Sequence, residues 1–384
     1  MIVRKRLTLV AAAALACAGL VGTAPASAGS PAEAPAAQPG VTVLATGLNG
    51  PRQVSGTSKY LYVAESDAAQ VSRVSKASGA VKLQVSGAAL AQGVVRTNDR
   101  FYIASGEQAP DDARAVNGSS EILVAKTGRR PSTFADLLAY ELKHNPDNQT
   151  QFGEDGNPLD ALSNPYFVVR SQVRGGFLLA ADAGGNDVLA ISRSGKVSTF
   201  FVPPSVTTGP CAGAEQNSDA GPSCDAVPTG LAWGPDGNLY VSAATGLAPG
   251  EGRVYVVNKN GRLVRTWTGF DGPTGVAVGA DGAVYVSELL EGLPGEPGAA
   301  AGSVVPSARA AEAAAAEPAF DPATVGRVVK VAPNGDRTFA QVTMPAGLLY
   351  ADGTLYASAW AVAGEFGIAD AGQVVKVDAS AFSK

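Results

Sequence analysis

The 384-residue sequence has few of the residues on which most enzyme active sites depend. It contains a single histidine, His144, which excludes every mechanism or metal centre that needs two or more histidines. No Ser-His-Asp arrangement, phosphate-binding loop or zinc-binding spacing is present. Charged residues make up only 16% of the chain. After the first 28 residues, no apolar run approaches the roughly 20 residues needed to span a bilayer.

Basic residues are also scarce, and three of them lie at positions 4–6. An apolar run over 7–21 follows, and small residues ending at Ala28 form the pattern of a signal-peptide cleavage site. We therefore predict a signal peptide over 1–28, cleavage after Ala28 and secretion, with 29–40 as a flexible segment. Without these three basic residues the net charge changes from −5 to −8, which argues against nucleic acid and anionic membranes as partners.

Cysteine is almost absent from the predicted mature chain. Only Cys211 and Cys224 remain, in a stretch rich in Gly, Pro and Ser. In an oxidising compartment this spacing predicts a local disulfide. The alternative, two unpaired thiols, is less consistent with export.

The chain contains an internal repeat. The stretches "AVPTGLAWGPDGNLYVSA" (226–243) and "DGPTGVAVGADGAVYVSE" (271–288) are identical at ten of 18 aligned positions, 45 residues apart. In each, an Asp-Gly pair separates two apolar runs, which is typical of a β-hairpin. Two more strand-like runs follow each hairpin. Four strands in a repeat of this length predict a β-propeller.

The number of blades follows from the positions where first strands begin. With the long gaps shortened to the common period, residues 41–384 contain six periods of 45. We therefore predict an all-β, six-bladed propeller over 41–384, in which the strand at 41–47 pairs beside 372–380, because an unclosed ring would leave unpaired backbone groups. The first-strand starts are Gln53, Gln92, Tyr166, Thr229, Thr274 and Ala346.

The long insertions all fall in loops that emerge on one face of such a propeller, and elaborated loops on a rigid scaffold usually carry binding. In the insertion 131–163 we expect a short helix with Ser132 or Thr133 as N-cap, Phe134, Leu137, Leu138 and Leu142 on its apolar stripe, His144 near its end and Pro146 as its stop. The composition of 289–325 predicts a disordered low-complexity loop. The insertions are 106–119, 131–163, 203–226, 244–251, 289–325 and 360–371.

Candidate ligand-binding residues are the polar side chains at first-strand starts and second-strand ends, because both positions lie at the mouth of the central channel. The densest group is "AADAGGND" (180–187), for which the alternative is a tight turn that binds its own backbone. Ca²⁺ prefers six to eight oxygen ligands, but no first-strand start is a carboxylate, so we predict no cofactor, with Ca²⁺ as the alternative. The candidates are Gln53, Glu65, Gln92, Asn164, Tyr166, Asp182, Asn186, Asp187, Thr229, Thr274 and Glu288.

Several motifs together resemble the ScyD/ScyE family of secreted bacterial six-bladed propellers. They are "AYELKHNPDN" (139–148), "SNPYFVV" (163–169), "LLAADAGGNDVLAISRSGKVS" (178–198) and "AVPTGLAWGPDGNLYVS" (226–242). The sequence is more distantly similar to NHL-repeat and gluconolactonase-type propellers. The family resemblance implies export and the propeller fold. Lactonase-type propellers hold a metal with acidic and amide side chains at the channel mouth, and this chain departs from that pattern at its first-strand starts.

These observations favour a monomeric, secreted, non-catalytic binding or scaffold module. Its loop-rich face would engage a small molecule, a glycan or another extracellular protein. The main alternative is a metal-dependent hydrolase or lactonase, with Glu65, Asp182, Asn186, Asp187 or Glu288 as ligands. A third hypothesis is an adhesion module at the cell surface.

Overall fold

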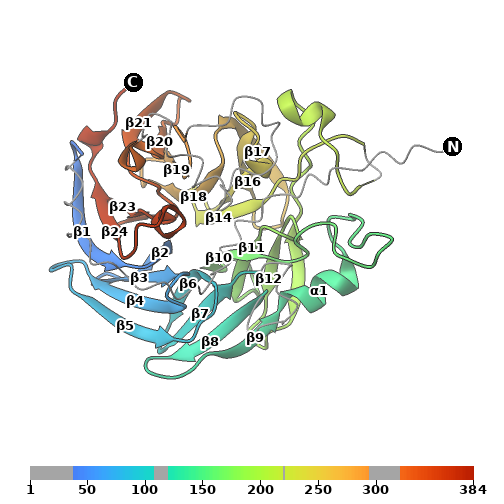
Figure 1. Cartoon of the computed structure of the whole chain (residues 1–384), viewed down its shortest axis with the longest axis horizontal. Helices are drawn as coiled ribbons and strands as arrows, with labels where there is room; N and C mark the ends of the chain where they lie inside the picture. Colours follow the sequence, from blue (N-terminus) through green and yellow to red (C-terminus); the bar gives the residue numbers. More distant parts are fainter. Residues whose placement is uncertain (1–37, 108–119, 219–220, 294–320) are drawn as a thin grey trace.

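The computed structural model describes residues 38–107, 120–218, 221–293 and 321–384. In these residues the strands form six four-stranded antiparallel sheets arranged around a centre, which confirms the predicted six-bladed β-propeller (Figure 1). The predicted signal peptide 1–28, most of the segment 29–40 and most of the low-complexity loop 289–325 lie outside the described residues. The same is true of residues 108–119 in the first insertion.

Each blade contains four strands in chain order from the inside of the ring to the outside, except the last. Blade 1 comprises β2 (Pro51–Gly56), β3 (Tyr60–Glu65), β4 (Gln70–Ser75) and β5 (Val81–Ser86); blade 2 comprises β6 (Ala91–Thr97), β7 (Arg100–Ser105), β8 (Glu121–Lys126) and β9 (Ser132–Asp136). Blade 3 comprises β10 (Pro165–Arg170), β11 (Leu178–Asp182), β12 (Asp187–Ile191) and β13 (Val197–Phe201); blade 4 comprises β14 (Pro228–Trp233), β15 (Leu239–Ala243), β16 (Gly252–Val257) and β17 (Leu263–Phe270). Blade 5 comprises β18 (Pro273–Val278), β19 (Val284–Glu288), β20 (Arg327–Val331) and β21 (Arg337–Gln341).

Blade 6 is built from both ends of the described chain. Its inner strands are β22 (Leu348–Ala351), β23 (Thr354–Ala359) and β24 (Gly372–Val377), and its outer strand is β1 (Val41–Leu48). Strand β1 runs antiparallel to β24, with Val41 opposite Val377. The first and last strands of the described chain therefore share one sheet, in which β1 pairs with the outer edge of β24.

The hydrophobic core lies between neighbouring blades. Successive side chains of a strand point to opposite faces of its sheet, so each blade contributes to two layers. In β15, Val241 packs with Phe167 and Leu179 of blade 3, whereas its neighbour Tyr240 packs with Val276 of blade 5. Both faces of the sheet are thus buried, which makes the strands largely apolar and the scaffold rigid.

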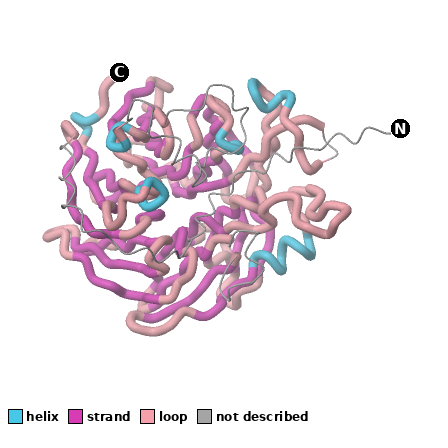
Figure 2. The backbone as a smooth tube through the Cα atoms, viewed as in Figure 1, coloured by secondary structure: helices cyan, strands magenta, loops and turns pink. Residues whose placement is uncertain are grey.

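Helical segments lie outside the strands, in the connecting loops (Figure 2). The 3₁₀ segments are η1 (Gly209–Gly213), η2 (Thr245–Leu247), η4 (Pro322–Thr324), η5 (Ala363–Phe366) and η6 (Ala379–Ala381). The α-helix α1 (Leu137–His144) lies at the rim beside blades 2 and 3 (Figure 1). No described helix is long and apolar enough to cross a membrane.

The predicted start of the helix in the insertion 131–163 is wrong. Residues 132–136 form β9, the outer strand of blade 2, in which Ala135 lies opposite Ile122. The N-cap is Asp136, whose carboxylate accepts a hydrogen bond from the Ala139 amide at 2.8 Å. Phe134 therefore belongs to the sheet, since the fourth strand must be completed before the helix begins. The helix ends at His144, followed by Asn145 in the left-handed region at φ 42°.

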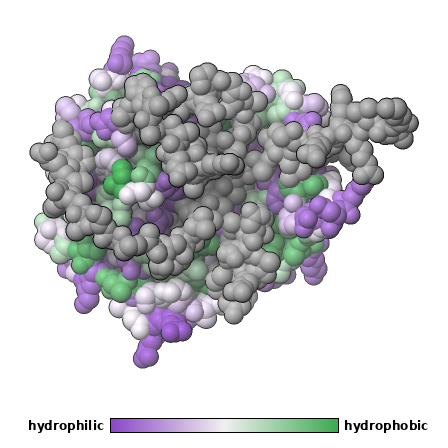
Figure 3. Space-filling view, viewed as in Figure 1, coloured by the Kyte–Doolittle hydropathy of each residue, from purple (hydrophilic) through white to green (hydrophobic). Residues whose placement is uncertain are grey.

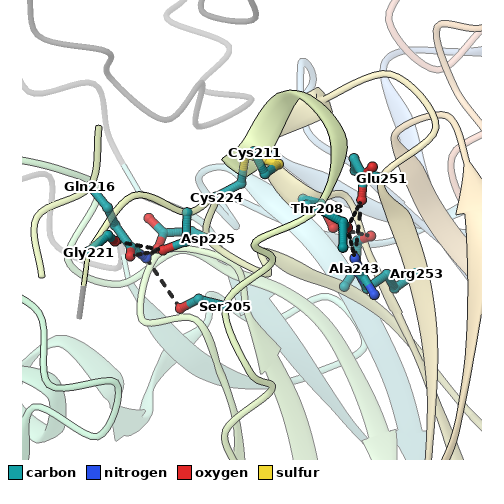
Figure 4. The surroundings of a disulfide bond; sticks show 12 residues. Ser205, Thr208, Cys211, Gln216, Gly221, Cys224, Asp225, Ala243, Glu251 and Arg253 are labelled. Atoms are coloured by element: carbon teal, nitrogen blue, oxygen red, sulfur yellow. Dashed lines mark hydrogen bonds and ion pairs between the residues drawn. A yellow bond between two sulfur atoms is a disulfide. The ribbon is translucent and has the colours of Figure 1, made fainter. Parts of the chain in front are cut away.

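The predicted disulfide between Cys211 and Cys224 is confirmed. It closes the loop that connects β13 to β14, where Val206 also forms a bridge with Cys224 (Figure 4). The loop is held at its base by a covalent bond and two backbone hydrogen bonds. The crosslink thereby fixes the position of the next residue, Asp225.

Candidate functional site

The polar residues at the starts of the first strands join blades to one another. Gln53, which is 3% exposed, donates from Nε2 to the Val168 carbonyl at 2.9 Å. Its Oε1 accepts from the amides of Val94 at 3.1 Å and Val168 at 3.0 Å. One side chain from blade 1 thus binds the inner strands of blades 2 and 3. This use of its amide group makes Gln53 part of the scaffold.

The threonines in blades 4 and 5 have the same role. Thr229 Oγ1 donates to the Pro273 carbonyl of the next blade at 2.7 Å. Thr274 Oγ1 donates to the Pro345 carbonyl at 3.2 Å. Gln92 in blade 2 is also buried, but its Oε1 has no hydrogen-bond partner in the structure. These inner-strand residues therefore differ: the threonines hold the ring together, and Gln92 retains a free acceptor.

The carboxylates at second-strand ends bind the segment that enters their own blade. Glu65 accepts from the Asn49 amide at 2.8 Å. Glu288 accepts from the Asp271 amide at 2.9 Å and pairs with Arg327 at 2.5 Å. Both glutamates are 1% exposed. They lie in blades 1 and 5, so the structure does not bring these two candidates together.

Asp182 ends β11 in the same way, at the centre of the motif "AADAGGND". Its carboxylate accepts from Ser163 Oγ at 2.6 Å, from the Asn164 amide at 2.6 Å, and from the amides of Gly184 at 3.2 Å and Gly185 at 3.1 Å. Burial raises the pKa of Asp182, and these hydrogen bonds oppose the shift. The turn therefore binds its own backbone, as the second interpretation of this motif expected.

Asp187 lies opposite Asp182 on the neighbouring strand β12. Its side chain is 0% exposed, and neither carboxylate oxygen has a hydrogen-bond partner. Burial raises the pKa of Asp187 well above its usual range, and the charges of Asp182, Glu141 and Asp147 raise it further. An isolated ionised carboxylate is strongly disfavoured in such a place. The surroundings of Asp187 therefore favour its neutral form.

Five more carboxyl groups from the insertions surround this turn, and sequence reasoning missed them all. Burial raises the pKa of Glu141 to about 8, helped by Asp147. Burial, with Asp182 and Asp160, raises the pKa of Glu107 to about 8, and Glu107 Oε2 has no hydrogen-bond partner. The five groups belong to Glu107, Glu141, Asp147, Asp160 and Asp225.

Asp160 and Asp225 form a carboxyl pair between blades 3 and 4. Burial raises the pKa of Asp160 to about 8, and the hydrogen-bonded Asp225 contributes to the shift. The neighbouring carboxyl group opposes ionisation of Asp160, because two like charges close together repel each other. Asp225 also accepts from the side-chain amide of Gln216 (Figure 4). The side-chain amide of Gln149 donates to it as well.

A small cavity opens at the point where these insertions meet. It has a volume of about 30 Å³ and extends from the turn of blade 3 to the loops of blade 4. Asp160 and Asp225 are its acidic lining residues, and its lining contains no Lys, Arg or His. We call it the acidic cavity. Five sequence-predicted candidates also line it: Asn164, Tyr166, Asn186, Thr229 and Thr274.

The carboxyl groups around the cavity have no cationic partner. In the described ranges, none of the seven forms an ion pair with Lys, Arg or His, whereas each ion pair found there involves other acids. Within the same ranges, no three His, Cys, Asp or Glu side chains are arranged to hold a metal ion. We call the following residues the acidic cluster: Glu107, Glu141, Asp147, Asp160, Asp182, Asp187 and Asp225.

A signal for part of this cluster was present in the sequence. Residues 145–160 contain four acidic residues and no basic one, which is unusual for a surface insertion where both signs normally alternate. Asp225 directly follows Cys224. The predicted disulfide therefore also implies that the backbone of Asp225 is held in place. The contacts between these segments depend on the tertiary fold and could not be read from either segment alone.

No protein-family model and no curated protein matches the sequence. The fold is similar to that of a protein of unknown function from Bacteroides thetaiotaomicron, with 12% identity, coverage of 88% of this chain and 75% of that one, and a TM-score of 0.50. A calcium-binding regucalcin from Agrobacterium tumefaciens is 12% identical over 87% of this chain and 92% of its own, with a TM-score of 0.49. A putative gluconolactonase is 13% identical over 90% and 93%, with a TM-score of 0.48. At these identities the likeness concerns the fold alone.

Proposed function

We propose that this chain is a secreted propeller of the ScyD/ScyE type that acts as a non-catalytic binding module for a small molecule. The acidic cavity is the proposed site. The observation that carries this proposal is the convergence of five predicted polar residues with two carboxyl groups from separate insertions on one cavity. A rigid ring with variable loops at one face is the usual design of a binding site.

The size of the cavity favours a small ligand over a macromolecule. A volume of about 30 Å³ accommodates a compact polar group and not an extended chain. Figure 3 shows hydrophilic and hydrophobic residues interspersed on the visible described surface of this view.

The alternative, a metal-dependent hydrolase, requires several of the candidate ligands to converge. Glu65 and Glu288 are in different blades and bind the backbone of Asn49 and Asp271. Asp182 accepts four hydrogen bonds from its own turn and the preceding segment. These carboxylates do not fit a shared metal, and we derive no reaction step through one.

A cavity-filling substitution tests the proposed site. Ala161 lines the cavity and is partly buried, so Ala161→Phe should occupy the space that a ligand needs. A panel of small metabolites is screened by thermal shift, since a ligand that binds only the folded state raises its stability by about 2.7 kcal/mol at 100 times its Kd. We expect at least one compound to stabilise the wild type and the control Ala371→Phe, but not Ala161→Phe. Equal stabilisation of both variants would place the ligand elsewhere.

A further inference from the structure

The two ends of the propeller differ in charge. The first-strand starts and the acidic cavity lie at one end of the ring, and antiparallel pairing places the turns between third and fourth strands at the other end. In blades 2, 3 and 4 each of these turns contains two basic residues and no acidic one. The whole chain, in contrast, has more acidic residues than basic ones. We call the following six residues the basic rim: Arg129, Arg130, Arg193, Lys196, Lys259 and Arg262.

The repeat itself does not require these charges. The corresponding turn of blade 5, at 332–336, contains Asp336 and no basic residue. The turn of blade 1, at 76–80, contains Lys76, which pairs with Asp352 at 3.0 Å. All six residues of the basic rim are exposed, and within the described ranges none of them forms an ion pair. The turns can therefore form without this positive charge, and the described acids do not neutralise it.

The three turns form one continuous row. Gly195 in the turn of blade 3 packs against the Phe134 carbonyl of blade 2, and a Cβ atom at this position would not fit. In the same way, Gly261 in the turn of blade 4 packs against the Phe200 carbonyl of blade 3. Each of these turns thus lies on the outer strand of the preceding blade, and the basic rim extends across three blades. An anionic partner that contacts all of it must be extended.

Two guanidinium groups at this end of blade 3 lie over one aromatic ring. Cζ of Arg193 is 5.1 Å and Cζ of Arg170 is 5.7 Å from the centroid of the Phe177 ring. Arg170 also donates from Nη1 to Thr97 Oγ1 at 3.2 Å, which holds its side chain in place. In the part of the chain that the structure describes, neither arginine pairs with a carboxylate. Because two like charges in this arrangement repel each other, an anion that contacts both is favoured.

The surroundings of the basic rim distinguish between kinds of anionic partner. Proteins that bind single-stranded nucleic acid stack bases on aromatic rings, but Tyr102 and Phe177 at this end are buried and pack edge to face. Double-stranded DNA is stiff over about 50 nm, whereas the basic rim follows a ring. Proteins that bind a lipid surface commonly insert apolar side chains, and the three turns contain no large apolar residue. A flexible polymer that is recognised by its charge fits these surroundings best.

We propose that the basic rim binds a linear acidic polysaccharide, a flexible polymer with a negative charge on its repeating unit. The polymer lies across the turns of blades 2, 3 and 4, where arginine side chains bind sulfate, phosphate or carboxylate groups through two parallel hydrogen bonds. The acidic end of the propeller repels the same polymer, so the acidic cavity stays accessible. The inference goes beyond the proposed function and does not depend on it.

Binding of dextran sulfate and of dextran to the purified protein tests the charge requirement, because the two polymers share a backbone and differ in charge. Biolayer interferometry measures both affinities at about 50 mM and about 200 mM salt. We expect dextran sulfate to bind and dextran not to bind. The affinity for dextran sulfate should fall by at least about tenfold at the higher salt concentration, since several basic side chains displace counterions from the polymer.

Two further probes test the class of polymer. They are a double-stranded oligonucleotide and phosphatidylglycerol vesicles, each at the same concentration of negative charge as dextran sulfate. We expect both to bind more weakly than dextran sulfate, because neither can follow the curved row of turns. Equal or tighter binding of either probe overturns the polysaccharide inference, in favour of nucleic acid or a lipid surface.

Matched variants locate the binding surface. The double variant Arg130→Gln, Lys196→Gln removes one charge from each of two neighbouring turns. It should lower the affinity for dextran sulfate by about tenfold at about 50 mM salt, and the slope of log affinity against log salt concentration should decrease by about one to two. The control, Lys143→Gln, Lys384→Gln, changes the net charge equally at two exposed residues outside the basic rim. Its affinity should stay within about twofold of the wild type, because distant charges are screened.

The contrary results are distinct. An equal loss of affinity in the two double variants shows that only the net charge matters, and overturns the basic rim as the site. Equal binding of dextran and dextran sulfate overturns the charge requirement, and this comparison on the wild type remains decisive if a variant does not fold. If dextran sulfate does not bind at about 50 mM salt, the inference fails while the proposed function at the acidic cavity is unaffected.

Discussion

Glu288 and Asp182 occupy equivalent positions in blades 5 and 3 but have opposite surroundings. Each lies opposite the proline that opens its own first strand, Pro273 and Pro165 respectively, and each accepts a hydrogen bond from the backbone segment that enters the blade. Beside Glu288 lies Arg327, which pairs with that carboxylate and with two other acids. The neighbours of Asp182 are further acids.

The difference separates what the repeat determines from what the insertions determine. The repeat places a hydrogen-bond acceptor at the end of the second strand, where it holds the incoming backbone. The first residue of the third strand then sets the nearest charge: Arg327 lies opposite Glu288, whereas Asp187 lies opposite Asp182. The insertions add the further acids around Asp182. In blade 5 the result is a compensated ion-pair network. In blade 3 it is a cluster of acids in which several carboxyl groups keep their protons at neutral pH.

The pH dependence of stability should show the largest effect of the acidic cluster. The pKa values of Glu107, Glu141 and Asp160 are raised to about 8 in the folded protein. The folded state therefore holds more protons than the unfolded chain. The contribution of these groups to the free energy of unfolding should be greatest below about pH 4 to 5, and it should fall as the pH rises through about 8. We expect a loss of several kcal/mol between about pH 5 and about pH 9 in urea denaturation, since each fully buried group of this kind contributes up to about 4 kcal/mol. A flat or rising profile over this range would contradict the account.

Removal of the disulfide tests whether the loop between β13 and β14 holds Asp225 in place. The double variant Cys211→Ser, Cys224→Ser should lower the free energy of unfolding by about 3 kcal/mol, because a short crosslinked loop restricts the unfolded chain. It should also weaken binding of any compound that the thermal-shift screen places in the acidic cavity, since Asp225 lines that cavity and directly follows Cys224. Reduced stability with unchanged binding of that compound would show that the crosslink is not needed to position Asp225.

Removal of the Arg327 charge should leave Glu288 in blade 5 without a cationic partner, as Asp182 is in blade 3. Arg327→Met leaves Glu288 buried without its ion-pair partner and should destabilise the protein by about 2 kcal/mol at pH 7. The pKa of Glu288, already raised by burial, should rise further. Arg262→Met is the control, since Arg262 is exposed and its loss should change stability by less than about 0.5 kcal/mol. Equal effects of the two variants would show that Arg327 has no special role.

The smallest expected effect has an unusual sign. Asp187→Asn replaces a buried carboxyl group by a neutral amide of similar shape. At about pH 8.5, where the wild type is penalised for its buried acids, this variant should be more stable by on the order of 1 kcal/mol. The gain should shrink as the pH falls toward about 4, where Asp187 is protonated in the folded and the unfolded chain alike. The control Glu154→Gln, which replaces an exposed acid, should show no such pH-dependent difference, and a destabilised Asp187→Asn at the higher pH would argue against a neutral Asp187.

The sequence predicted the scaffold far better than the site. The Asp-Gly hairpins and the period of 45 residues are local signals, so they specify blades, their number and the loops that carry insertions. The outer strand β9 was not predicted, and its residues were assigned to the helix of the insertion. Phe134 and Ala135 fit either a strand or an amphipathic helix when tertiary pairing is unknown. The candidates at strand ends were chosen for their polarity, but Gln53 and Glu65 use that polarity to bind backbone. Contacts such as that of Asp160 with Asp225 join separate insertions, and only the folded ring brings them together.

The central claim is that the fold buries a group of carboxyl groups without a cationic partner, so that several of them keep their protons near neutral pH. Carbon-13 NMR titration of the side-chain carboxyl groups in the folded wild type tests it most directly, with Asp160→Asn used to assign the Asp160 signal. We predict that Glu107, Glu141 and Asp160 titrate near pH 8, about four pH units above ordinary acidic side chains. Titration of all three groups near pH 4 would contradict the claim.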